Sequence, residues 1–374
     1  MSVNSNLLGL VFANMHDASV LELTKQRTMG SILYGGRYRL IDFPLSNMCN
    51  SGVSEVGVIT KSNYQSLLDH LGSGREWDLA RKKGGLHLLP PFCNVNSGMY
   101  RGRLEALYGI YSFIDRADAD YVVLSDCDIV TNISFKPIVK KHIETGADIT
   151  VIYSSTNASM EQCKHATIVS LDDDNNVVDV LINPLMSGSC CMSLNMFVVT
   201  KKFLLDMVAE AYSKSKYSFE RDILQARCSE YNIKGYKHDG YFQKIDSIQS
   251  YYTGNMELLN TENCDKLFNT DSPIYTKIRD NAPAKYGIDS TVSNSLIADG
   301  CIIEGTVENS VLFRGVKIEK GACIKNSILM QDTKIGQKCQ ISCVITDKAV
   351  EISNFKMLTG SANYPLFIGK NAII

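Results

Sequence analysis

Two acidic residues, Asp126 and Asp128, follow directly after the apolar run 121–125 and flank Cys127. A continuous apolar run of this kind is typical of a strand buried in a parallel sheet. Open α/β sheets place their sites at the carboxyl ends of such strands. Carboxylates are ligands that Mg²⁺ prefers, whereas a thiol is a soft and normally protonated group. The pattern therefore places a candidate site at the end of this strand.

A second distinctive stretch is 35–52, with the sequence GGRYRLIDFPLSNMCNSG. Two adjacent glycines open it, and Arg39 and Asp42 follow. Pro44 suits the first turn of a helix, and Gly52 suits the position just past a helix end. The stretch therefore predicts a loop, a short strand, a turn and a helix.

Strands and helices alternate through the first two thirds of the chain. Apolar runs predict strands at 7–13, 53–60, 121–125, 147–153 and 196–200, and a hairpin at 166–185. Apolar periodicity predicts helices at 64–71, 133–146, 202–214 and 219–231. This alternation indicates an α/β sheet. Residues 256–288 lose the pattern and are rich in Asn and Pro, as in a linker or a docked irregular arm.

The remainder of the chain has a different spacing of apolar residues. Apolar residues recur in steps of five or six, at Ile297, Ile302, Val307, Leu312, Ile318, Ile324, Leu329, Ile335 and Ile341. A period near six is typical of a parallel β-helix built from hexapeptide repeats, in which each face of a triangular coil contributes one inward apolar residue. An ordinary β-sandwich is the alternative.

Length, charge and composition limit the classes of protein to which this chain can belong. The 374 residues are too many for one ordinary core, so two domains are expected. The formal net charge of −2 argues against a nucleic acid as the main partner. The amino-terminal segment lacks a basic region before its apolar run, and no apolar run is long enough to span a membrane. With twelve cysteines but no C-x-x-C pair, we expect reduced thiols in a cytoplasmic protein.

The run 35–52 also resembles the signature GGKYRLIDFxLSNxxNSG of bacterial ADP-glucose pyrophosphorylases (glucose-1-phosphate adenylyltransferases), and the resemblance covers nearly the whole chain. It implies a nucleotide-diphospho-sugar transferase (GT-A, Rossmann-like) domain with a mixed sheet at 1–255. A linker or docked arm at 256–288 and a left-handed β-helix at 289–374 would follow. In the family, a phosphate oxygen of glucose 1-phosphate attacks the α-phosphate of ATP, with Mg²⁺ and cationic groups stabilising the transition state.

The chain departs from the family at the phosphate loop. The family's Gly-Gly-x-Gly-Thr-Arg is replaced by 14–19, and its following Lys-Pro is replaced by 29–30. No glycine remains to let the backbone approach phosphates, and a carboxylate is added that would repel them. The degenerate positions are Asn14, Met15, Asp17, Ser19 and Met29.

The metal and sugar-phosphate positions depart as well. Cys127 stands at the position of one metal aspartate and Lys244 at that of the other, and Asn183 replaces the lysine that binds glucose 1-phosphate. Asp126, Asp128 and Asp246 are weak candidates for displaced metal ligands. Lys244 is alternatively a built-in cation paired with Asp126 or Asp128, or is simply exposed.

These losses resemble GlgD-type, catalytically deficient subunits. The resemblance implies a regulatory or structural subunit of a hetero-oligomer, by family analogy a tetramer. It implies no cofactor on this chain and Mg²⁺ in a catalytic GlgC-type partner. Arg27 and Arg39 match positions near the family's effector site, and form either an anion site or structural ion pairs, for instance to Asp42. An active nucleotidyltransferase and a stand-alone sugar-phosphate sensor are the alternatives. His16 and His70 are expected to be ordinary loop and helix histidines.

Overall fold

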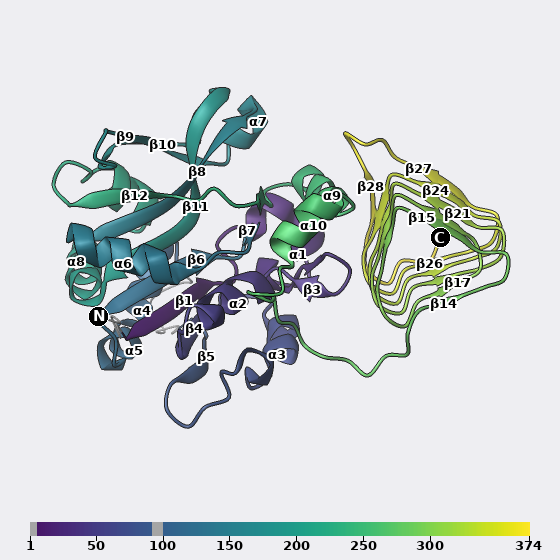
Figure 1. Cartoon of the computed structure of the whole chain (residues 1–374), viewed down its shortest axis with the longest axis horizontal. Coiled ribbons are helices and arrows are strands. Elements are labelled where there is room, and N and C mark those ends of the chain that lie inside the picture. Colours follow the sequence, from purple (N-terminus) through teal and green to yellow (C-terminus); the bar gives the residue numbers. More distant parts are fainter. Residues whose placement is uncertain (1–5, 92–99) are drawn as a thin grey trace.

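A computed structural model describes residues 6–91 and 100–374. These residues form a sheet-containing part and a triangular β-helical coil (Figure 1). Residues 1–5, in the segment expected not to be a signal peptide, and Cys93 lie outside the described ranges. Within those ranges, no helix is both long enough and apolar enough to cross a membrane.

The first part is built on a nine-stranded mixed sheet with the order β10-β9-β11-β6-β1-β4-β5, in which β8 pairs with β11 and β12. Its strands are β1 (Leu7–Phe12), β4 (Glu55–Ile59), β5 (Gly85–Leu89), β6 (Tyr121–Asp126), β8 (Ile149–Ala158), β9 (Thr167–Leu171), β10 (Val177–Ile182), β11 (Gly188–Thr200) and β12 (Ile233–Lys237). The predicted α/β class with a mixed sheet is confirmed, because β1 pairs in parallel with β4 and β6 whereas β11 is antiparallel to β6.

Helices lie around this sheet, some of them between it and the triangular coil (Figure 1). They are α1 (Leu21–Thr24), α2 (Asp42–Asn50), α3 (Gln65–Leu71), α4 (Arg103–Gly109), α5 (Tyr111–Arg116), α6 (Phe135–Thr145), α7 (Met160–Cys163), α8 (Lys201–Ser213), α9 (Ile248–Glu257) and α10 (Thr261–Leu267). The helix predicted at 219–231 is shorter and differently wound, a π-helix at Glu220–Gln225 followed by turns. Helix α10 lies inside the stretch that had no helical pattern.

Two short ribbons flank the strand ends. The first pairs β2 (Leu33–Tyr34) with β3 (Tyr38–Arg39), across the adjacent glycines of the stretch 35–52. The second pairs β7 (Ile129–Thr131) with β13 (Phe242–Lys244). It therefore brings Lys244 near the acids that follow β6.

The second part is a parallel β-helix with three faces of five strands each. The first face contains β14 (Lys285–Tyr286), β17 (Ile302–Ile303), β20 (Lys317–Ile318), β23 (Lys334–Ile335) and β26 (Glu351–Ile352). The second face contains β15 (Thr291–Ser293), β18 (Thr306–Glu308), β21 (Cys323–Lys325), β24 (Gln340–Ser342) and β27 (Met357–Thr359). The third face contains β16 (Leu296–Ile297), β19 (Val311–Leu312), β22 (Ile328–Leu329), β25 (Val344–Thr346) and β28 (Leu366–Ile368). The period near six is the step from one face to the next, whereas Ile303, Ile318 and Ile335 occupy successive rungs of one face in the core. Ile302, the predicted inward residue, is half-buried, and its neighbour Ile303 points inward instead.

The two parts share a hydrophobic core. Phe313 and Met330 of the coil join the same buried cluster as Tyr251 and Leu258 of the first part. The Tyr252 hydroxyl donates a 2.7 Å hydrogen bond to the carbonyl of Asn326. The segment after α10 docks on the sheet-containing part, where the Asn50 side-chain amide donates to the carbonyl of Pro273. The predicted domain boundaries stay a prediction, although this packing agrees with a docked arm.

Candidate functional site

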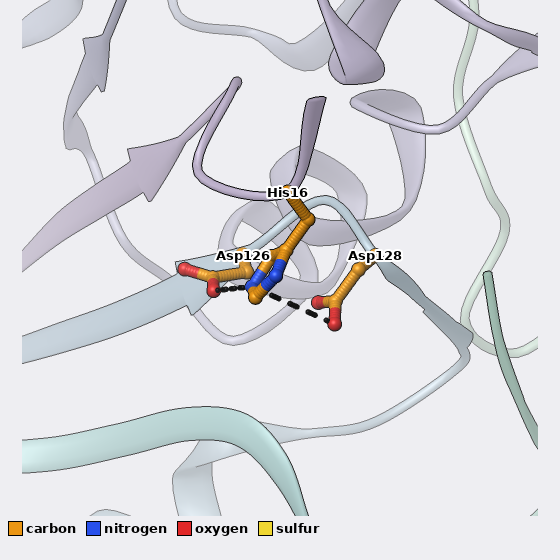
Figure 2. Close-up of side chains that lie close together, drawn as sticks. All are labelled: His16, Asp126 and Asp128. Atoms are coloured by element: carbon orange, nitrogen blue, oxygen red, sulfur yellow. Dashed lines mark hydrogen bonds and ion pairs between the residues drawn. The ribbon is translucent and has the colours of Figure 1, made fainter. Parts of the chain in front are cut away.

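The acids at the end of β6 lie in a closed cluster of charged side chains. Asp126 and Asp128 are 1% and 0% exposed. His16, from the loop after β1, points between them (Figure 2). Its Nε2 lies 2.7 Å from Asp126 Oδ2 and 3.7 Å from Asp128 Oδ2. The expectation that His16 is an ordinary loop histidine is therefore wrong, because the parallel pairing of β1 with β6 places its loop beside these acids.

Arg103, the first residue of α4, completes the cluster. Its Nη2 donates a 2.6 Å hydrogen bond to Asp126 Oδ2, and its Nη1 lies 2.9 Å from Oε1 of Glu220. The guanidinium is 2% exposed and lies over the rings of Phe12, Phe197 and Phe219. Sequence reasoning missed Arg103, since a lone arginine after a glycine carries no local signal of burial.

Burial and neighbouring charges shift the pKa values of the residues in this cluster. Burial lowers the pKa of His16, but Asp128 and the hydrogen bond to Asp126 outweigh it and raise that pKa to about 9. Burial raises the pKa of Asp126, yet Arg103 and His16 hold it below its usual range. Burial and the neighbouring Asp126 raise the pKa of Asp128, which also accepts a 2.7 Å hydrogen bond from Asn195. The two cations therefore compensate the buried carboxylates.

The residues at the family's metal positions do not fit Mg²⁺. Cys127 turns away from the acids into the hydrophobic core beside Gly30, and burial raises the pKa of its thiol well above the usual value. Lys244 pairs with neither acid within 4 Å among the described residues, and its ammonium donates instead to the carbonyl of His165. Mg²⁺ prefers near-octahedral oxygen ligands with several waters, which a thiol and an ammonium cannot supply.

The degenerate phosphate-loop residues are used for internal contacts. Asp17 accepts a 2.8 Å hydrogen bond from the backbone N–H of Met29, and burial raises its pKa to about 7. Asn14 Oδ1 accepts from the Tyr100 hydroxyl at 3.1 Å. Met15 packs on the core, and Ser19 lies in the 3-10 helix Asp17–Val20. The side chains of Asn14, Met15 and Asp17 therefore contact neighbouring parts of the chain.

Two further candidates lie apart from the His16 cluster. Asn183 has a positive φ of 52° after β10, and its N–H donates to the carbonyl of Ala166. Asp246 precedes α9 and lines a different pocket, together with Phe242 and Glu257.

A second cluster of charges lies between the two parts. Arg27 donates two 2.7 Å hydrogen bonds to the carboxylate of Asp347 in the coil. Arg39 donates to the carbonyl of Ser66 at 2.6 Å, while Asp42 is paired with His70 at 2.5 Å. The suggested pairing of the arginine guanidinium groups with Asp42 is therefore wrong. His70 is likewise not an ordinary helix histidine, because Asp42 is buried and needs a partner.

A small cavity adjoins these residues and is lined by Leu33, Gly36, Arg37, Arg39, His70, Arg279, Phe313, Arg314 and Gln331. Lys348 is part of the same charged region. Burial lowers its pKa to about 7, and the nearby Arg39, Arg27 and Arg279 contribute to this shift. Arg279, Arg314 and Lys348 were not expected from sequence, because they follow Arg27 and Arg39 by more than 200 residues.

Gly102 positions Arg103, and its replacement tests that role. A Cβ at Gly102 would lie 2.3 Å from the carbonyl oxygen of Tyr217. We expect Gly102→Ala to lower the free energy of unfolding by about 1–3 kcal/mol, because the backbone at Gly102 and the backbone at Tyr217 must move apart. Urea denaturation measures this. Gly109→Ala in the same helix is the control, since a Cβ there meets nothing within 4 Å; equal losses in the two variants would contradict the prediction.

Comparison with known proteins agrees with this architecture. Residues 20–261 match the family described as nucleotidyl transferase, and residues 282–360 match that described as GlmU-like, C-terminal hexapeptide. The chain is 35% identical to the glycogen biosynthesis protein GlgD of Bacillus subtilis (strain 168) over 371 residues, 99% of this chain and 97% of that protein. It is 33% identical to the glucose-1-phosphate adenylyltransferase of Clostridium botulinum (strain Alaska E43 / Type E3), over 87% of this chain and 85% of that protein. It is 36% identical to the GlgD protein of Geobacillus stearothermophilus, over 86% of this chain and 84% of that protein.

Proposed function

This chain belongs to the nucleotidyl transferase family of GlgD proteins and glucose-1-phosphate adenylyltransferases, and from that membership we propose that it is a GlgD-like subunit of a hetero-oligomeric adenylyltransferase. In this role it is inactive or weakly active alone, and it stabilises or regulates a catalytic GlgC-type subunit that holds Mg²⁺. The assembly makes ADP-glucose for glycogen in the cytoplasm.

One observation carries the proposal: the acids at the end of β6 are neutralised by His16 and Arg103. Phosphoryl transfer needs Mg²⁺ and cationic groups directed at the transferred phosphate. Here the nearest cations face protein carboxylates instead. The thiol of Cys127 and the tethered ammonium of Lys244 stand where the family has metal aspartates.

An activity assay of the chain alone and mixed with a GlgC-type partner tests this function. We expect ADP-glucose formation from ATP, glucose 1-phosphate and Mg²⁺ to be at least about 100-fold slower for the chain alone than for the partner, since several charge-stabilising groups are missing together. We expect the mixture to co-purify and to respond differently to effectors. Robust activity of the chain alone would overturn the proposal and favour an enzyme with displaced metal ligands. Isolation of the native chain without a partner subunit would favour the stand-alone sensor.

The cavity between the two parts supports a second role, binding of a phosphorylated effector. Arg37, Arg39, Arg279 and Arg314 line it. Only one of these guanidinium groups, that of Arg314, has a carboxylate partner within 4 Å among the described residues, Asp299 at 3.1 Å. Guanidinium groups that converge on a cavity and mostly lack a carboxylate partner suit an anion with several oxygen atoms. The proposed site would join both parts of the chain, so its occupancy would bias their packing.

Proton uptake tests the anion site. The Lys348 pKa of about 7 is well below that of a free lysine, so its amine is mostly neutral at pH 8. A nearby anion favours the ammonium and raises this pKa, so binding takes up protons and weakens as the pH rises from 7 to 9. We expect titration calorimetry with sulfate at pH 8, in buffers of different ionisation enthalpy, to show uptake of a fraction of a proton per anion.

Lys348→Met should abolish this uptake. Lys334→Met is the control, because Lys334 is exposed and pairs with Glu351 on the coil surface. Unchanged uptake in Lys348→Met would contradict the role of this lysine.

A further inference from the structure

We propose that His16, Asp126 and Asp128 form a binding site for a divalent transition-metal ion such as Zn²⁺, distinct in its ligands from the magnesium site of the family. The proposal goes beyond the subunit function above and does not depend on it. It rests on the donor atoms, on two unpartnered carboxylate oxygens and on the charge of the cluster.

The donor atoms converge. His16 Nε2 and one oxygen from each of Asp126 and Asp128 lie within 4.8 Å of one another (Figure 2). The distances from Nε2 to the nearest carboxylate oxygens are 2.7 and 3.7 Å. Bonds of about 2.0–2.2 Å in a tetrahedral site place ligand atoms about 3.3–3.5 Å apart. The two observed separations lie on either side of this value.

Two buried oxygens lack partners. Asp126 Oδ1 and Asp128 Oδ1 accept no hydrogen bond from the described residues, although both side chains are at least 99% buried. Arg103 and His16 both contact the other oxygen of Asp126, and Asn195 contacts the other oxygen of Asp128. Orphaned buried carboxylate oxygens are costly, and a cation bound through both oxygens of each carboxylate would satisfy them.

Charge also favours a divalent ion. Metal binding displaces the proton that His16 otherwise carries, and three carboxylates (Asp126, Asp128 and Glu220) then face the single guanidinium of Arg103. The positive charge of Lys244 favours the ionised form of Asp128 from outside the cluster. The Lys244 ammonium itself donates to the carbonyl of His165. The cluster therefore retains net negative charge that a divalent ion offsets.

The mixed donor set selects the kind of ion. One imidazole with two carboxylates suits Zn²⁺ and related transition metals, whereas Mg²⁺ prefers oxygen ligands alone and keeps several waters. The ion takes the place of the proton on His16 Nε2. Because His16 is the ligand from the half-buried loop after β1, it is also the residue whose replacement least threatens the fold.

Titration of the full chain, freed of metals with a chelator, tests the site. We expect one Zn²⁺ per chain to bind through His16, and His16→Gln to weaken this binding at least about tenfold. An excess of Mg²⁺ should not displace Zn²⁺. His87→Gln is the matched control, because His87 is 41% exposed and lies 3.5 Å from Glu55 on the surface. Equal zinc binding by the parent chain and His16→Gln would overturn the proposal, as would the absence of zinc binding.

Cobalt substitution separates this site from thiol sites. Co²⁺ bound by one imidazole and two carboxylates gives visible bands without sulfur-to-metal charge transfer. Cys127→Ser should leave the spectrum unchanged, since its thiol points into the core. A charge-transfer band lost in Cys127→Ser would overturn the assignment. Circular dichroism of each variant checks that the fold is retained, and because the readout is metal binding, the result is independent of catalytic activity.

Discussion

Replacing Arg103 by methionine is expected to lower the free energy of unfolding by about 3–5 kcal/mol, because removing one partner of a buried ion pair leaves an uncompensated charge. Asp126, at 1% exposed, loses its guanidinium partner, and Glu220 loses its contact as well. Methionine retains the contact with the rings of Phe12 and Phe197, so the loss is mainly electrostatic. Urea denaturation followed by the fluorescence of Trp77 measures the change.

Arg101→Met is the control for this variant. Arg101 is 60% exposed and pairs with Glu105 one helical turn away, so its removal should have little effect. A second variant, Arg103→Met with Asp126→Asn, should recover part of the stability by removing the orphaned charge. If Arg103→Met proves no less stable than Arg101→Met, the buried cluster does not contribute as described.

Replacing Arg27 by methionine is expected to cost a similar amount, about 3–5 kcal/mol, because Asp347 would remain buried without its partner. The pair joins parts of the chain separated by 320 residues, with side chains 3% and 6% exposed. Its loss should also loosen the packing between the sheet-containing part and the coil. We expect the fluorescence of Trp77, in the first part, to change at lower urea concentration than the far-ultraviolet circular dichroism of the whole chain, to which the strands of the coil also contribute.

The double variant Arg27→Met with Asp347→Leu should recover most of this loss, since a buried pair replaced by apolar groups of similar size is often neutral. Lys325→Met is the control on the coil surface, where Lys325 pairs with the exposed Glu308. Equal stability of the parent chain and Arg27→Met, with coincident transitions, would contradict an energetic role for this contact.

The two proposals for the strand-end cluster concern different questions. The subunit function depends on the absence of groups that stabilise a transferred phosphate, whereas the metal site depends on three donor atoms that are present. A chain that binds Zn²⁺ and still lacks adenylyltransferase activity satisfies both. A chain that is active with Mg²⁺ and binds no Zn²⁺ overturns both.

Much of the architecture was determined by the sequence itself, because the local spacing of apolar residues indicates which elements form. The β-helix repeats one inward apolar position per face, so Ile318, Ile324 and Leu329 indicate its three faces without any knowledge of distant contacts. The run 121–125 likewise indicated a buried strand ending at Asp126, since a strand covered on both faces must be apolar throughout. The missing glycines at 14–19 were equally visible as residue types.

The tertiary structure alone decided which charges meet. His16 and Asp126 are 110 residues apart, and Arg27 and Asp347 are 320 residues apart, so neither pairing leaves a local pattern. The sequence left Lys244 either paired with the acids or simply exposed, yet the β7–β13 ribbon directs it to a backbone carbonyl, and Arg103 enters from α4 to pair with Asp126. The physical reason is that burial, not residue type, determines which side chains need a partner. Burial is fixed only when the sheet, its helices and the coil pack together.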